Sequence, residues 1–98
     1  MNYSIIFHPK IEDDLKVFSH TQKKLILKQF QKIVKSPELG KLLGNKNGYD
    51  LSGFRKMYAD NKQIRIVYKI VEEKIIIEVV ALGKRDEMEV YKKASQRI

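Results

Sequence analysis

Residues 64–91 read IRIVYKIVEEKIIIEVVALGKRDEMEVY, and the fold we expect depends on this stretch. Two runs rich in β-branched residues, 64–71 and 75–81, flank a short charged segment, and this pattern is typical of a β-hairpin. Side chains alternate along the first run, so one face carries Ile64, Ile66, Tyr68 and Ile70 and the other carries Arg65, Val67, Lys69 and Val71. The first set is wholly apolar apart from one phenol, so we expect it to face the core, with Tyr68 buried.

A symmetric loop at residues 71–74 sets the register that we expect for this hairpin. Ile70 then lies opposite Ile75, Tyr68 opposite Ile77, and Ile66 opposite Val79, with Ala81 on the same face. On the other face, Glu78 comes within diagonal reach of Arg65 and Lys69. A slip of one residue would bury these charges, which favours the stated register. The hairpin therefore predicts an apolar face for packing and an open, basic face.

Helices are predicted for the first third of the chain, after a strand at residues 2–7. One helix follows Pro9, with Ile11, Leu15 and Phe18 on one side. A second begins at Thr21 as N-cap and ends at Ser36-Pro37. Its apolar stripe comprises Leu25, Ile26, Phe30, Ile33 and Val34. We expect the two helices to form an antiparallel hairpin on the apolar face of the sheet.

Residues 38–53, ELGKLLGNKNGYDLSG, are rich in Gly and Asn and predict a long connection. A strand at 54–58 and a turn at Asp60-Asn61 follow. Asp86 and Glu89 predict the start of a last helix that ends near Arg97 and brings Tyr91 over the basic face. The fold class is therefore α+β: one domain, residues 1–98, with a small antiparallel sheet in the order β-α-α-β-β-β-α and a helical hairpin on one face.

Composition limits the possible partners of this 98-residue chain. Its 20 Lys and Arg outnumber 12 Asp and Glu, and a formal charge of +8 favours a polyanion such as nucleic acid. The absence of cysteine excludes disulfides and thiolate zinc sites. No apolar run is long enough to span a bilayer and no signal peptide is recognisable, so we expect a cytoplasmic protein with no membrane partner.

The residues show no Ser-His-Asp set, no metal-ligand spacing and no phosphate-binding glycine loop, so we expect no metal and no cofactor. His8 and His20 are interpreted as capping or surface residues. What remains is a set of cations and tyrosines. RNA carries its own nucleophile in the 2′-hydroxyl group, and cutting it needs a base and a clamp for negative charge on the phosphate. Arginines supply such a clamp.

The succession SPELGKLL, DLSGFRK and IRIVYKIVEEKIIIEVVALGKRDEMEVY resembles the RelE/ParE superfamily of bacterial toxins, and specifically its RelE branch. The resemblance covers nearly the whole chain and implies a microbial RNase-type fold. It also implies the toxin of a type II toxin–antitoxin module, an mRNA endonuclease that cleaves message in the ribosomal A site. The implied partners are mRNA, the ribosome and a cognate antitoxin.

The same resemblance assigns the site residues. Its strand arginine falls on Arg65, the arginine of its GKR turn on Arg85, its C-terminal tyrosine on Tyr91 and the first of its two strand lysines on Lys56. The second lysine falls on Tyr58, so the general base is open among Tyr58, Lys56 and Lys62. Residues expected to bind RNA are Arg55, Tyr58, Lys62 and Lys84.

Other interpretations stay open on the same residues. The scaffold could belong to a ParE-like gyrase inhibitor, or to a non-catalytic module that binds RNA or the ribosome. Arg65 could form an ion pair with Glu78 on a solvated face. Lys84 and Arg85 could serve solubility alone, and Tyr91 could pack its helix against the sheet.

Overall fold

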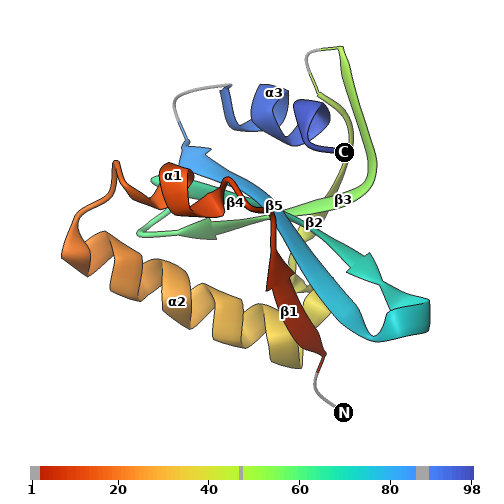
Figure 1. The fold of residues 1–98 in the computed structure, drawn as a ribbon, viewed down its shortest axis with the longest axis horizontal. Helices are drawn as coiled ribbons and strands as arrows, with labels where there is room; N and C mark the ends of the chain where they lie inside the picture. The colour runs from red at the N-terminus through yellow and green to blue at the C-terminus, as the bar shows by residue number, and fades with distance from the viewer. Residues whose placement is uncertain (1–2, 47, 86–88) are drawn as a thin grey trace.

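The protein is described here by a computed structural model that covers residues 3–46, 48–85 and 89–98. The described strands are β1 (Ser4–Phe7), β2 (Lys41–Lys46), β3 (Tyr49–Ala59), β4 (Ile64–Val71) and β5 (Ile76–Lys84). The described α-helices are α1 (Ile11–Leu15), α2 (His20–Lys35) and α3 (Glu89–Gln96). The strands form one sheet in the order β1-β5-β4-β3-β2, with α2 and α3 on opposite sides of it (Figure 1).

Each face of the sheet has its own apolar cluster. Beneath α1 and α2 the buried residues are Ile11, Phe18, Ile26, Phe30, Ile33, Ala59, Ile64, Ile66, Tyr68, Ile77, Val79 and Leu82. Beneath α3 they are Leu43, Leu51, Phe54, Val67, Val80, Ala81, Val90, Tyr91 and Ala94. The first cluster confirms the predicted core face, including Tyr68, and the second shows that the basic face is only partly open.

Helix α2 begins two residues earlier than the sequence predicts. Ser19, not Thr21, is its N-cap, since the Ser19 Oγ accepts from the Gln22 N–H at 3.1 Å and the Gln22 Oε1 accepts from the Ser19 N–H at 3.0 Å. This capping box satisfies two backbone donors that the helix leaves unpaired. The helix ends at Lys35, as expected from Ser36-Pro37.

The sheet is antiparallel as expected except at its edge strand β1, which pairs with β5 in parallel from Ser4↔Ile76 to Phe7↔Val79. Parallel neighbours need a long crossover, and the chain between β1 and β5 supplies one because it includes α1 and α2. The other neighbours, β2–β3, β3–β4 and β4–β5, are antiparallel.

Residues 38–53, predicted as a connection, contain β2 and the first part of β3 after a short 3-10 turn at Pro37–Leu39. The glycines that argued against strands occupy irregular positions within them. Gly44 has φ +68° beside a register shift between Leu42 and Gly44, and Gly53 has φ +86° within β3. Glycine adopts these angles without steric cost, so a β-bulge can bend the strand there. The β2–β3 hairpin lies beside α3 (Figure 1).

The predicted register of β4 and β5 is also wrong, by two residues near the loop and by three farther on. Ile70 pairs with Ile77, Tyr68 with Val79 and Ile66 with Leu82. Ile75 does not extend the strand, because it closes a 3-10 turn with φ +53°. A bulge between Val67 and Tyr68 in the pairing then shifts the alternation of β5. Ala81 therefore belongs to the cluster under α3 instead of the core face.

Helix α3 covers part of the face expected to be open. Val90, Tyr91 and Ala94 are buried against Val67 and Val80 of the sheet. The close approach depends on Gly83, because a Cβ built at this residue would come within 3.3 Å of the Val90 Cβ. The expected N-cap Asp86 lies outside the described residues.

Candidate functional site

A row of residues across three strands forms the centre of the basic face. Tyr58 of β3 pairs with Arg65 of β4, which pairs with Gly83 of β5. Lys56 lies two residues before Tyr58 and therefore on the same face. Gly83 has no side chain, and α3 packs over it. The side chains of this row therefore come from β3 and β4.

Arg65 rests on Tyr91. Its guanidinium carbon lies 4.9 Å from the centre of the Tyr91 ring, and Tyr91 is only 2% exposed. An arginine over an aromatic face gains cation–π energy and keeps a defined orientation. Tyr91 therefore packs α3 against the sheet and supports Arg65 with the same ring.

Arg85 reaches the other tyrosine of the face. Its guanidinium carbon lies 5.8 Å from the centre of the Tyr58 ring. The backbone N–H of Arg85 donates to the carbonyl of Gln63 at 2.8 Å, so the end of β5 is tied to the β3–β4 turn. This backbone contact brings Arg85 beside Tyr58 although the two residues lie 27 positions apart in the chain.

Lys56 forms a hydrogen bond with the hydroxyl group of Tyr58. The Lys56 Nζ donates a hydrogen bond to the Tyr58 Oη at 2.9 Å and lies 5.0 Å from the ring centre. This hydrogen bond lowers the pKa of Tyr58 most; partial burial opposes it, and hydrogen bonding and charge from Arg65, with the charge of Lys56, lower it further. The pKa of Tyr58 falls from 10.0 to about 8.

Five of the residues expected from the sequence are thus brought together in one cluster: Lys56, Tyr58, Arg65, Arg85 and Tyr91. We call this set the cationic site. Lys62 lies at the same end of the sheet, exposed in the β3–β4 turn with φ +69°. The positive charges of the set favour a phosphate-bearing ligand.

Arg55 and Lys84 are not brought to the cationic site. Arg55 pairs with Tyr68 on the face that α2 covers, and its guanidinium donates to the carbonyls of Gly40 at 2.7 Å and Glu38 at 3.3 Å. Lys84 is exposed and pairs with Ile64, whose side chain also faces α2. A shift of one position along a strand reverses the face, so neighbours of site residues in sequence lie on the opposite side.

The register also separates Arg65 from Glu78. Glu78 pairs with Lys69, four residues along β4 from Arg65, which instead pairs with Gly83. The interpretation of Arg65 as an ion-pair partner of Glu78 is therefore wrong, because it depended on a register that the 3-10 turn at Glu72–Lys74 and the bulge together displace.

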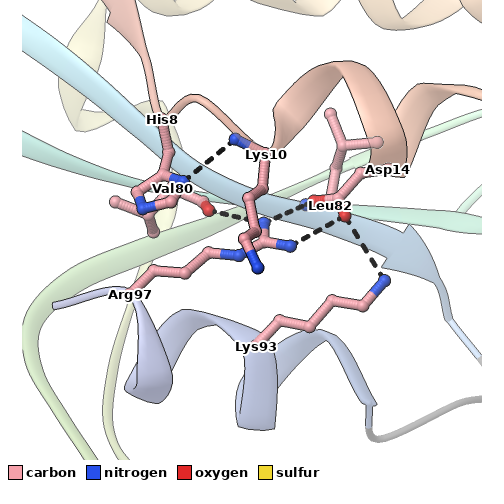
Figure 2. Close-up of polar contacts among 7 residues, drawn as sticks. All are labelled: His8, Lys10, Asp14, Val80, Leu82, Lys93 and Arg97. Carbon is pink, nitrogen blue, oxygen red and sulfur yellow. Dashed lines mark hydrogen bonds and ion pairs between the residues drawn. The ribbon is translucent and has the colours of Figure 1, made fainter.

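A second polar cluster was not anticipated from the sequence (Figure 2). Asp14 of α1 is 4% exposed and accepts from both terminal guanidinium nitrogens of Arg97, at 2.7 and 3.0 Å, and from the backbone N–H of Leu82 at 3.2 Å. Lys93 lies 3.4 Å from the same carboxylate, and Arg97 also donates to the carbonyl of Val80 at 3.0 Å. The Asp14 cluster thus joins α1, β5 and the α3 region.

Asp14 is one of three carboxylates in the first turn of α1, and no local pattern separates it from Asp13. Its one distinguishing mark is position, because Asp14 shares the buried side of α1 with Ile11. The Nδ1 of His8 accepts from the backbone N–H of Lys10, the N-cap residue of α1, at 3.1 Å (Figure 2), and no side-chain hydrogen bond caps α1 among the described residues.

Within residues 3–46, 48–85 and 89–98, no group of three or more His, Cys, Asp or Glu side chains is placed to hold a metal ion. Over the same described residues, no helix is long and apolar enough to cross a membrane.

Comparison with known proteins finds the same family along nearly the whole chain. Residues 5–94 match the profile of the ParE-like toxin of type II bacterial toxin–antitoxin systems. The chain is 34% identical over 103 residues to a putative RelE-like toxin protein of Escherichia coli. It is 28% identical over 100 residues to the mRNA interferase toxin RelE of Escherichia coli strain K12. Both alignments cover 100% of this chain and 99% of the relative.

Solved structures agree with this result. A double-arginine mutant of Escherichia coli toxin RelE in the free state has a TM-score of 0.78 and 26% identity. The same mutant in complex with a peptide of the antitoxin RelB has a TM-score of 0.70 and 26% identity. Each comparison covers 100% of this chain and 99% of the other.

Proposed function

This chain belongs to the family of ParE-like toxins of type II bacterial toxin–antitoxin systems, and we propose that it acts as an mRNA endonuclease of the RelE kind that stops translation. The observation that carries the proposal is the convergence of Arg65, Arg85, Lys56 and Tyr58 at one end of the sheet. RNA cleavage needs positive charge around one phosphate, and these residues supply it.

The chemistry follows from the substrate. The 2′-oxygen attacks the adjacent phosphorus, and the bond from phosphorus to the 5′-oxygen breaks, which leaves a cyclic phosphate and a free 5′-hydroxyl end. Negative charge builds on the phosphate oxygens in the transition state. Arg65 and Arg85 offset it, since a guanidinium group donates two parallel hydrogen bonds to a phosphate and stays charged. Lys56 adds a third positive charge beside them.

Tyr91 takes a supporting role in this proposal. Its ring is buried under Arg65, so it is a positioning residue that fixes the guanidinium instead of stacking on a base. Lys62, exposed beside the site, is assigned to contact the RNA backbone. Arg55 and Lys84, which face the other side, are left out of the site.

We also propose that the reaction needs no metal ion. The cationic site consists of guanidinium, ammonium and phenol groups, which repel a divalent cation and offer it no carboxylate. A phosphorothioate at the scissile phosphate tests this directly, because Mn²⁺ binds sulfur better than Mg²⁺ does. Equal slowing in Mg²⁺ and Mn²⁺ buffers is expected, and rescue by Mn²⁺ would contradict metal independence.

The proposed partners are message, the ribosomal A site and an antitoxin. The relative named mRNA interferase supports the first, and the RelE mutant solved with an antitoxin peptide supports the third. With a formal charge of +8, an acidic antitoxin segment is the expected complement. A protein that acts on translating ribosomes would work in the cytoplasm.

Primer extension on message from a reconstituted translation reaction tests the function. We expect toxin-dependent cuts that require ribosomes and fall about 100-fold or more in Arg65→Ala and Arg85→Ala, the effect of removing a transition-state donor. Lys28→Ala is the control, because it removes one exposed charge from α2 on the opposite side of the sheet.

The other outcomes separate the rival functions from one another and from an error in the site assignment. An absence of cuts together with inhibited DNA supercoiling would indicate a gyrase inhibitor. Ribosome binding without cuts would indicate a non-catalytic module. Cuts that persist in both arginine variants would overturn the site assignment and leave the endonuclease function intact.

A further inference from the structure

The cationic site contains one group that can accept a proton while its neighbours stay charged. We propose that Tyr58, as the phenolate, is the general base that deprotonates the 2′-hydroxyl group. This inference rests on the proposed endonuclease function and deepens it, because the sequence left the base open among Tyr58, Lys56 and Lys62.

Geometry separates the three candidates. The Lys56 Nζ donates to the Tyr58 Oη at 2.9 Å, and an ammonium that donates has no lone pair with which to take a proton. Lys62 is exposed in the β3–β4 turn, where water surrounds it. Tyr58 lies in the cross-strand row with Arg65, and Arg85 lies over its ring at 5.8 Å. The phenol oxygen is therefore the acceptor closest to the clamp for the phosphate.

The surrounding charges make the phenolate accessible. Three cations face Tyr58 from the described elements around it: Lys56 from β3, Arg65 from β4 and Arg85 from the end of β5. Asp60, two residues along the chain, accepts from Gln22 of α2 at 3.2 Å and so faces the other side. The pKa of Tyr58, lowered to about 8 chiefly by the Lys56 hydrogen bond, suits a base that acts near neutral pH.

The step balances in atoms and charge. The Tyr58 phenolate takes the proton of the 2′-hydroxyl group while the 2′-oxygen forms a bond to phosphorus. The bond from phosphorus to the 5′-oxygen breaks, and the 5′-oxygen leaves with a proton from solvent. Tyr58 is then a phenol, and loss of its proton to water restores the phenolate for the next turnover.

Titration of the free protein tests the first half of the inference. Among five tyrosines, one should ionise near pH 8 by ultraviolet absorbance, and this transition should vanish in Tyr58→Phe. In Lys56→Met it should move up toward 10, the ordinary value. Tyr49 lies on the same strand but outside the cationic site, so Tyr49→Phe should keep the transition near pH 8. If the transition near pH 8 survives in Tyr58→Phe, the proposed phenolate is wrong.

Single-turnover cleavage of ribosome-bound message between pH 6 and 9.5 tests the second half. The wild-type rate should rise tenfold per pH unit and level off near pH 8. Tyr58→Phe should be about 100-fold slower or more and should lose this bend. Lys56→Met should move the bend upward.

The outcomes distinguish the base from the function. Tyr58→Phe that cuts within a few-fold of wild type, with the same bend, would show that another group is the base while the endonuclease function stands. A wild-type protein that makes no cuts would overturn both proposals together.

Discussion

Tyr68, Tyr58 and Tyr91 share one side-chain chemistry but have different roles, because their surroundings differ. The hydroxyl group of Tyr68 is buried and donates to the carbonyl of Pro37 at 2.6 Å while it accepts from the N–H of Gly40 at 2.9 Å. Burial raises the pKa of Tyr68 despite the opposing Gly40 hydrogen bond. Tyr58 faces cations and its pKa is lowered. Residue type alone does not distinguish these roles.

Tyr68→Phe should lower the free energy of unfolding by about 1–3 kcal/mol, because a buried donor and a buried acceptor lose their partner. Urea denaturation followed by circular dichroism measures the change. Tyr49→Phe is the control, since no buried hydrogen bond is recorded for its hydroxyl group among the described residues. Equal stability of Tyr68→Phe and wild type would mean that water replaces the hydroxyl group.

Tyr91 should support Arg65 through its ring and not through its hydroxyl group. Tyr91→Phe keeps the ring 4.9 Å from the guanidinium and should cleave message within about threefold of wild type. Tyr91→Leu keeps apolar volume but removes the ring face, so its kcat should fall about tenfold or more with KM little changed. A large loss in Tyr91→Phe would instead assign a chemical role to the hydroxyl group.

At the scale of elements, the Asp14 cluster holds α1, β5 and the α3 region together (Figure 2). β1 pairs with β5 only as far as Val79, and beyond it Asp14 and Arg97 bind the free Leu82 N–H and Val80 carbonyl. The cluster therefore continues the sheet edge with side chains. Because α3 carries Tyr91, the cluster also fixes the element on which Arg65 rests.

Asp14→Asn should lower the free energy of unfolding by about 3 kcal/mol at pH 7, since it leaves the buried Arg97 charge without its carboxylate. Thermal unfolding at pH 7 measures this loss of stability. Asp13→Asn is the matched control: its ion pair with Lys16 is exposed on both sides, and its loss should change the melting temperature little.

The effect should depend on pH in a defined direction. Burial raises the pKa of Asp14, but the hydrogen bonds from Arg97 and Leu82 and the charges of Arg97 and Lys93 outweigh it, so the pKa is lowered from 3.8. A lowered folded-state pKa gives stability that is complete above the unfolded value and is lost as pH falls through the folded value. The advantage of wild type over Asp14→Asn should thus shrink below about pH 4, and a constant difference down to pH 2 would contradict the cluster.

Particular strands show which parts of the fold could be predicted from the sequence and which could not. The alternation at 64–71 identified β4 and its core face correctly, since period-two patterning reflects burial directly. The strands in residues 38–53 were missed because Gly44 and Gly53 oppose regular pairing and instead mark a bulge or a bend. The predicted β4–β5 register failed because nothing local in the sequence marks the 3-10 turn that removes Ile75 from the strand or the bulge farther on.

At the scale of the whole molecule, positive charge covers both sides of the sheet, but the cationic site occupies one. Helix α2 lies on the side of the sheet opposite α3 (Figure 1). Lysines of α2 such as Lys28 and Lys32 are exposed. They contribute to the net charge of +8 as much as Lys62 or Arg85 does. Net charge alone therefore does not locate the RNA surface.

The salt dependence of RNA binding should locate the RNA-binding surface. Affinity for a 2′-O-methyl RNA, which lacks the nucleophile, should fall linearly with salt on logarithmic axes, and each lost phosphate contact should reduce the slope by about 0.7. Lys62→Ala and Arg85→Ala should show this reduction, whereas Lys28→Ala and Lys32→Ala should keep the wild-type slope. An equal effect of all four would mean that RNA binds by net charge and not at the cationic site.

The sequence by itself determined the fold class and the core face of β4, because apolar periodicity is a local property, and its resemblance to a known family supplied the candidate residues of the proposed site. Only the tertiary structure decided that β1 runs parallel to β5, that Arg55 faces away and that Arg65 stands over Tyr91 instead of beside Glu78. It alone joined Asp14 to Arg97 across 83 positions. Such contacts depend on register, bulges and chain crossover, which arise when distant segments pack together and leave no periodic trace in the chain.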